Sequence, residues 1–96
     1  MRPKVLVTRE LPEEAMKRLE KHCDVDLNDE DRPLTRQELM QRIRDKDGLL
    51  SMLTDRIDGE LMDAAPGLKV ISNYAVGFNN IDVKEATRRG IPLTNT

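Results

Sequence analysis

The stretch GLLSML, at positions 48–53, is short, almost wholly apolar and flanked by polar residues on both sides. A strand that is buried on both faces of a parallel sheet has this composition. The sequence predicts a helix on each side of it, because Thr35 and Glu38 form a capping box before one apolar stripe and Asp58 can cap the next. A buried strand between two helices indicates an α/β fold in which this strand is central.

The same alternation of strand and helix continues from this stretch to both ends of the chain. The predicted strands are residues 4–8, 24–28, 48–53, 68–72 and 91–94, and the predicted helices are residues 12–22, 35–44, 58–65 and 82–90. Strands separated by helices require right-handed crossovers and therefore a parallel sheet. The half-polar second strand suits a sheet edge, and Pro92 confines the fifth strand to an edge or a strand start, because proline cannot donate to a ladder.

These elements predict a single domain, residues 1–96, with a flavodoxin-like (βα)4β fold and a five-stranded parallel sheet of order 2-1-3-4-5. The pattern ends on a strand, so we expect a fold that is incomplete at its C-terminal end.

Composition narrows the possible classes of function. The net charge is −2 and charges of both signs are interspersed, so the basic stripe needed for nucleic acid is missing. No apolar run approaches the roughly 20 residues of a membrane span, and the N-terminus differs from a signal peptide. Cys23 is the sole cysteine, which excludes an internal disulfide and fits a reducing compartment. We expect a cytoplasmic protein with no membrane and no nucleic-acid partner.

Ligands of an open parallel sheet bind beyond the carboxyl ends of its strands, which here are residues 8–11, 51–57 and 73–82. In the third loop, Gly77 would let the backbone approach an anion, with main-chain N–H groups as donors. From spacing alone, a Gly77 that only permits a turn is the simpler interpretation.

The stretch NYAVGFNNID at 73–82, together with TRRGIPLTNT at 87–96, resembles the D-2-hydroxyacid dehydrogenases. Residues 53–58, LTDRID, are similar to the glyoxylate/hydroxypyruvate reductase branch of that family. The likeness spans the whole chain, although the first forty residues are only compatible with it. It implies the N-terminal part of a substrate-binding domain.

The resemblance also implies a set of substrate-binding residues. Main-chain N–H groups of the loop at Val76 and Gly77 would bind the substrate carboxylate, and Met52 and Leu53 would line the same pocket. The implied ligand is a small 2-oxo or 2-hydroxy acid, which we expect this chain alone to bind weakly. The implied cofactor of the parent enzyme is NAD(P).

Other parts of such an enzyme are missing from the sequence. The glycines stand at positions 48, 59, 67, 77 and 90. They never take the dinucleotide spacing G-x-G-x-x-G, so we expect no cofactor-binding residue in this chain. By the resemblance, the family's substrate-binding Arg and its Glu and His fall beyond Thr96. We therefore expect no catalytic and no metal-binding residue, and a truncated chain or isolated domain that is inactive by itself.

The family resemblance further implies a helix that returns from the extreme C-terminus to cover this domain. The chain offers only four predicted helices for the two faces of the sheet. One face should therefore be under-covered, and we expect the chain to self-associate.

Four tempting residues have plainer interpretations. His22 is expected at the end of a helix, and Cys23 is expected to be a small buried apolar residue. Arg9 and Arg56 are expected to be ordinary solvated charges. Both arginines follow strands, however, and could steer an anion toward the site. The acidic run at 24–31 lacks the glycine and terminal glutamate of a calcium loop, so a solvated edge strand and loop are expected.

Three other functions share this fold plan. A phosphoreceiver would need an acidic pair after the first strand, an Asp ending the third and a Lys ending the fifth. Those places hold Thr8-Arg9-Glu10, Ser51-Met52-Leu53 and Thr94-Asn95 in this chain. A flavodoxin would need a glycine-rich phosphate loop after the first strand, which residues 8–13 do not provide. A non-catalytic binding or scaffold module remains the alternative.

Overall fold

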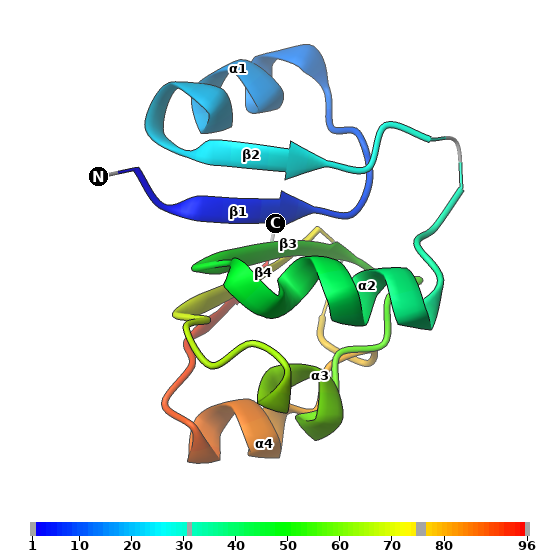
Figure 1. The fold of residues 1–96 in the computed structure, drawn as a ribbon, viewed down its shortest axis with the longest axis vertical. Coiled ribbons are helices and arrows are strands. Elements are labelled where there is room, and N and C mark those ends of the chain that lie inside the picture. Colours follow the sequence, from blue (N-terminus) through cyan, green and yellow to red (C-terminus); the bar gives the residue numbers. More distant parts are fainter. Residues whose placement is uncertain (1, 31, 75–76, 96) are drawn as a thin grey trace.

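The computed structural model describes residues 2–30, 32–74 and 77–95 and has a five-stranded parallel sheet flanked by helices (Figure 1). The strands are β1 (Lys4–Val7), β2 (Asp24–Leu27), β3 (Gly48–Met52), β4 (Val70–Tyr74) and β5 (Leu93–Asn95). The helices are α1 (Glu13–His22), α2 (Arg36–Arg42), α3 (Gly59–Asp63) and α4 (Val83–Arg88), with a 3-10 turn, η1 (Ile43–Asp45), after α2. The strand order β2-β1-β3-β4-β5 confirms the predicted topology and fold class.

Side chains that alternate along the strands supply two separate apolar clusters. Leu6, Leu49 and Ile71 point to the larger cluster, which α2, α3 and α4 cover. Val7 and Leu50, one residue further along β1 and β3, point to the smaller cluster beneath α1. Among the described residues, α2, α3 and α4 therefore lie on one face of the sheet and α1 lies on the other (Figure 1).

The α1 face of the sheet is only partly covered. Val70 and Tyr74 of β4 lie on this face, as alternation from buried Ile71 requires, and they are 39% and 45% exposed. Leu50 and Met52 on the neighbouring β3 are half-buried. The predicted shortage of helices is thus visible as an exposed apolar strip over β3 and β4, which we call the open face (Val70, Tyr74, Leu50 and Met52).

The predicted fourth strand, 68–72, was placed two residues too early. Leu68 is buried, but its N–H donates to Ala65 O at 3.1 Å, so it belongs to the turn after α3. Asn73 and Tyr74, predicted as loop, pair with Ser51 and Met52 in the β3–β4 ladder. An apolar residue that closes a helix onto the core looks like a strand residue in the sequence, which explains the error.

The predicted helix caps are confirmed at α2, α3 and α4. Thr35 and Glu38 form the full capping box, while Asp58 and Asp82 accept hydrogen bonds from the third residue of their helices. Pro12 precedes α1 as its N-cap residue and contributes no side-chain hydrogen bond. The predicted end of the second helix near Arg44 corresponds to the 3-10 turn rather than to α2 itself.

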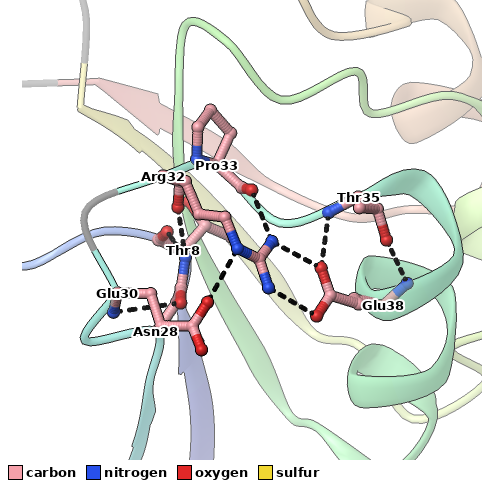
Figure 2. Close-up of polar contacts among 7 residues, drawn as sticks. All are labelled: Thr8, Asn28, Glu30, Arg32, Pro33, Thr35 and Glu38. Carbon is pink, nitrogen blue, oxygen red and sulfur yellow. Dashed lines mark hydrogen bonds and ion pairs between the residues drawn. The ribbon is translucent and has the colours of Figure 1, made fainter.

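The loop between β2 and α2 is held by a cluster of polar contacts that Figure 2 shows. The Asn28 side-chain amide donates to Thr8 O at 3.1 Å and to Arg32 O at 2.8 Å. The Arg32 guanidinium donates hydrogen bonds to both oxygens of the Glu38 carboxylate, at 2.8 and 3.0 Å. It also forms an ion pair with Glu30 at 2.7 Å. This hydrogen bonding by Arg32, and then by the Thr35 backbone, lowers the pKa of Glu38 to about 2.

The acidic run is therefore less solvated than the sequence indicated. Asn28 is only 2% exposed, and the side chain of Asp26 is half-buried against Arg42 and Lys46. A hydrogen bond from Arg42 is the largest cause of a lowered pKa at Asp26. The run serves to attach the edge strand to α2, and the expectation of a purely solvated strand and loop is wrong at these two positions.

Candidate functional site

The candidate site lies at the carboxyl edge of the sheet, where the loops after β1, β3 and β4 meet. Parallel strands present these ends on the same side, which is where ligands of open α/β sheets bind. The loop after β1 begins at Thr8, whose N–H donates to Leu50 O at 3.1 Å. Thr8 is 1% exposed and thus belongs to the support of the site rather than to its surface.

Asp55 ties the loop after β3 to the loop after β1. Its carboxylate accepts a hydrogen bond from the Met52 N–H at 2.8 Å and another from the Thr8 hydroxyl. The Asp55 N–H donates back to Met52 O at 3.0 Å, which closes a tight turn over residues 52–55. Asp55 is 4% exposed, so its carboxylate is shielded from water.

Asn73, near the end of β4, organises the third loop. This side chain is fully buried, and its amide nitrogen donates to Gly77 O at 3.1 Å and to Asn80 Oδ1 at 2.8 Å. The Ser51 hydroxyl donates to Asn73 Oδ1 at 2.9 Å. Every polar atom of this amide is therefore paired, as burial demands.

Asn80 bridges the two loops. Its side-chain nitrogen donates to Met52 O at 3.0 Å and to Asp55 O at 2.8 Å. Backbone pairing of Ile57 with Ile81 adds a second link, because the Ile57 N–H donates to Asn80 O at 2.9 Å. The turn at 52–55 and the turn at 77–80 thus form one connected unit.

Two of the expected substrate-binding residues, Leu53 and Gly77, lie in the two turns of this unit. Leu53 is 57% exposed although it is apolar, and it follows directly after β3. Gly77 has φ of 88°, a conformation that glycine adopts without steric cost. Met52 is half-buried at the end of β3, on the α1 side of the sheet. Val76 lies outside the described residues.

Charged residues around the unit are engaged with other side chains. Arg56 pairs with Asp58 at 3.5 Å, and Arg36 holds the same carboxylate at 2.6 Å. Arg9 is exposed. His22 lies in the last turn of α1, as expected, and Cys23 follows it half-buried. The described residues thus present main-chain donors and apolar side chains at the site, and no three His, Cys, Asp or Glu side chains among them could hold a metal.

The helix N-termini of the described residues do not suit a dinucleotide pyrophosphate, which needs free N–H groups at a positive helix end. Asp58 and Asp82 already occupy the N-termini of α3 and α4 with carboxylates. The first turns of all four helices carry glutamates: Glu13, Glu14, Glu38, Glu60 and Glu85. The helix N-termini of the described residues therefore do not fit the pyrophosphate of NAD(P).

No helix among the described residues combines the length and apolar character needed to cross a bilayer.

A sequence model of one protein family, described as D-isomer specific 2-hydroxyacid dehydrogenase, catalytic domain, matches residues 5–96. The chain belongs to this family. A glyoxylate reductase of Thermococcus kodakarensis is 52% identical over 96 residues, which cover 100% of this chain and 29% of the relative. The chain thus spans about 29% of the length of this curated relative.

Two solved structures share this fold over the whole length of the chain. A protein from Pyrococcus horikoshii OT3 superposes with a TM-score of 0.89 at 39% identity, covering 100% of this chain and 28% of that one. An NADPH-dependent glyoxylate/hydroxypyruvate reductase from Sinorhizobium meliloti, in complex with NADP and malonate, superposes with a TM-score of 0.71 at 28% identity, again over 100% and 28%.

Family membership confirms the resemblance seen in the sequence, but the residues that support the site were missed. Asp55, Asn73 and Asn80 were part of the quoted stretches, yet no role followed from their spacing. The available signal was their position, since Asn73 lies near the carboxyl end of β4, and Asp55 and Asn80 lie in the loops that follow β3 and β4. Each also has a partner 22 to 47 residues away along the chain, so these contacts required the fold.

Proposed function

We propose that this chain is the substrate-binding part of an NAD(P)-dependent reductase of the glyoxylate/hydroxypyruvate type. The observation that carries the proposal is the unit at the carboxyl edge of the sheet, in which hydrogen bonds of Asn73 and Asn80 link the turn at Gly77 to the turn at 52–55, which contains the exposed Leu53. Family membership and the names of the relatives support the same assignment.

In this proposal the main-chain N–H groups at Val76 and Gly77 bind the carboxylate of a small 2-oxo or 2-hydroxy acid. The positive φ of Gly77 supports this role, because backbone turns of this kind expose successive N–H groups to an anion. Met52 and Leu53 would contact the rest of the ligand. Their apolar side chains suit a small acid without a second charge.

The chain supplies binding and orientation, and the remaining chemistry belongs to the parent enzyme. Reduction of a 2-oxo acid needs a hydride from the nicotinamide and a proton for the new hydroxyl. Among the described residues, no histidine lies at the Gly77 turn to donate this proton. The helix N-termini do not fit the cofactor. The chain alone should therefore bind a 2-oxo acid weakly, fail to bind NAD(P)H and reduce nothing.

Two further features belong to the proposal. The open face gives the chain an apolar surface that a second copy of itself would cover, so we propose self-association of the isolated chain. A cytoplasmic location is proposed because the single cysteine is free, as is usual in a reducing compartment.

A titration of the isotope-labelled chain with glyoxylate, followed by two-dimensional amide NMR, tests the function. We expect the largest shifts at Gly77 and its neighbours, with a Kd of roughly 1 mM or weaker because a few backbone donors make only part of a site. Ethylene glycol, a neutral two-carbon compound without a carboxylate, is the control and should leave these amides unchanged. Shifts centred elsewhere, or equal shifts with the control, would refute carboxylate binding at this turn and favour a scaffold module.

A further inference from the structure

The side-chain amides of Asn73 and Asn80 lie between the two turns to which the proposed function assigns substrate binding. Asn80 reaches the turn at 52–55 and Asn73 reaches Gly77, and the two amides bond to each other at 2.8 Å. Asn73 is fully buried and Asn80 half-buried. The chain Met52–Asn80–Asn73–Gly77 is therefore a continuous hydrogen-bonded path from one turn to the other.

A count of protons fixes the orientation of both amides. The Asn80 nitrogen has two protons and lies near three oxygens, Met52 O at 3.0 Å, Asp55 O at 2.8 Å and Asn73 Oδ1 at 3.2 Å. The two main-chain carbonyls are the closer acceptors, and Asn73 Oδ1 already accepts from Ser51. If the Asn80 amide were flipped, its oxygen would face two carbonyl oxygens. The protons of Asn80 are therefore committed to the turn at 52–55.

The same count applies to Asn73, whose two protons go to Asn80 Oδ1 and Gly77 O. Because a trans peptide unit is planar, a Gly77 carbonyl held toward Asn73 directs the N–H of Phe78 the opposite way. The buried amide thereby fixes the orientation of the peptide unit that follows Gly77. The N–H of Phe78, next to the donors proposed at Val76 and Gly77, thereby gains a defined direction.

We infer that Asn80, oriented by Asn73, is a positioning residue that sets the separation and orientation of the two substrate-binding turns. The inference rests on the proposed function. Asn80 has no proton left for a ligand, so it would act through Met52, Asp55 and Gly77 rather than by contact. The β3–β4 ladder, from Gly48↔Val70 to Met52↔Tyr74, does not include Asn80. Loss of the amide should therefore displace the turns and leave the sheet in place.

The test compares Asn80→Asp and Asn80→Ala with Asn79→Asp and Asn79→Ala in the same chain. Asn79 is an exposed neighbour, so its variants control for added charge and for lost side-chain volume in the same loop. Glyoxylate is titrated by amide NMR at a temperature well below the unfolding transition of each variant. At that temperature a lower stability leaves the measured Kd unchanged, so the Kd reports positioning.

We expect both Asn80 variants to weaken glyoxylate binding by about tenfold, since displacement of binding groups by an ångström is enough for losses of that order or more. Each Asn79 variant should bind within about twofold of the wild type, because its side chain makes no contact in the network. Amide shifts of α1, β1 and β2 should stay at their wild-type values in all four variants.

Each other outcome has a defined meaning. Folded Asn80 variants that bind like their Asn79 counterparts would overturn the positioning role and leave the proposed function standing. A wild-type chain without glyoxylate shifts at Gly77 would remove the proposed function and this inference with it. If neither Asn80 variant folds, the test uses Ser51→Ala, which removes a single hydrogen bond to Asn73 Oδ1. Weaker glyoxylate binding by this variant supports the inference, and an unchanged Kd overturns it.

Discussion

At the scale of single residues, the site depends on buried polar groups that carry no chemistry themselves. Asp55 is the clearest case, because its carboxylate is 4% exposed and accepts hydrogen bonds from Thr8 and from the Met52 N–H. Leaving a buried donor without an acceptor lowers the free energy of unfolding by more than an average hydrogen bond contributes to it. The stability of the turn at 52–55 should therefore be concentrated in this one side chain.

We predict that Asp55→Ala lowers the free energy of unfolding by roughly 2 kcal/mol, because it removes the acceptor of the Met52 N–H and leaves the Thr8 hydroxyl only the longer contact to Leu50 O at 3.5 Å. Thr54→Ala, at the exposed position next to it, should change the free energy of unfolding by no more than about 0.5 kcal/mol. Chemical denaturation monitored by circular dichroism measures both. Equal effects of the two substitutions would show that the Asp55 hydrogen bonds do not support the turn.

The sequence could not reveal these roles. Thr8 and Asp55 are 47 residues apart, and Asn80 lies 25 residues from Asp55, so their contacts exist only after the strands have been arranged. Gly77 differs, because a glycine between a strand and a helix carries its own conformational signal, and its positive φ is observed. Local backbone constraints were predictable, and long-range polar pairing was not.

At the scale of elements, caps and strands were predicted where a local rule decides them. The capping box of α2 and the Asp caps of α3 and α4 depend only on residues three positions apart. The position of β4 failed because buried Leu68 has the hydrophobicity of a strand residue but lies in the turn after α3. The carboxyl end of β4 matters for the site, since the corrected boundary places Asn73 inside the strand and so fixes its side chain.

The ion pair between Arg32 and Glu38 at the start of α2 makes the free energy of unfolding depend on pH in the acid range. Because hydrogen bonds in the folded state lower the pKa of Glu38 to about 2 from 4.5, its stabilisation is complete above about pH 4.5. That stabilisation is lost as the pH falls toward 2. We predict that wild type loses more stability between pH 4.5 and pH 2 than Glu38→Gln does, measured by urea unfolding.

The matched variant is Arg32→Gln, which removes the partner of Glu38 and should flatten the same part of the pH profile. The double variant should show no further change, because both substitutions remove one interaction. If the free energy of unfolding falls with pH equally in the wild type and in both single variants, the acid sensitivity does not come from this ion pair.

At the scale of the whole molecule, the two faces of the sheet are unequally covered. Among the described residues, α2, α3 and α4 cover one face and α1 covers the other (Figure 1). Val70 and Tyr74 of the open face are 39% and 45% exposed. Burying apolar surface yields about 25 cal/mol per Å², so covering this strip would add appreciably to the stability of a small domain. The sequence predicted this shortage correctly, because it followed from counting elements.

We predict that the isolated chain associates through the open face at tens of micromolar, and that exchange of the terminal strand between copies is one available route. Tyr74→Asp should shift the mass measured by light scattering after size exclusion toward that of a monomer. Val83→Asp is the control, because Val83 is 43% exposed on α4, across the sheet from the open face. A wild-type chain that is strictly monomeric would show that four helices suffice.

The central claim is that these 96 residues are the substrate-binding part of a 2-hydroxyacid dehydrogenase. The most direct test replaces the matching segment of the Thermococcus kodakarensis glyoxylate reductase, which is 52% identical, with this chain. NAD(P)H-dependent reduction of glyoxylate by the chimera is then compared with that of the parent and of the isolated chain. We predict that the chimera reduces glyoxylate while the isolated chain does not. A folded chimera that binds the cofactor but leaves glyoxylate unreduced would contradict the claim.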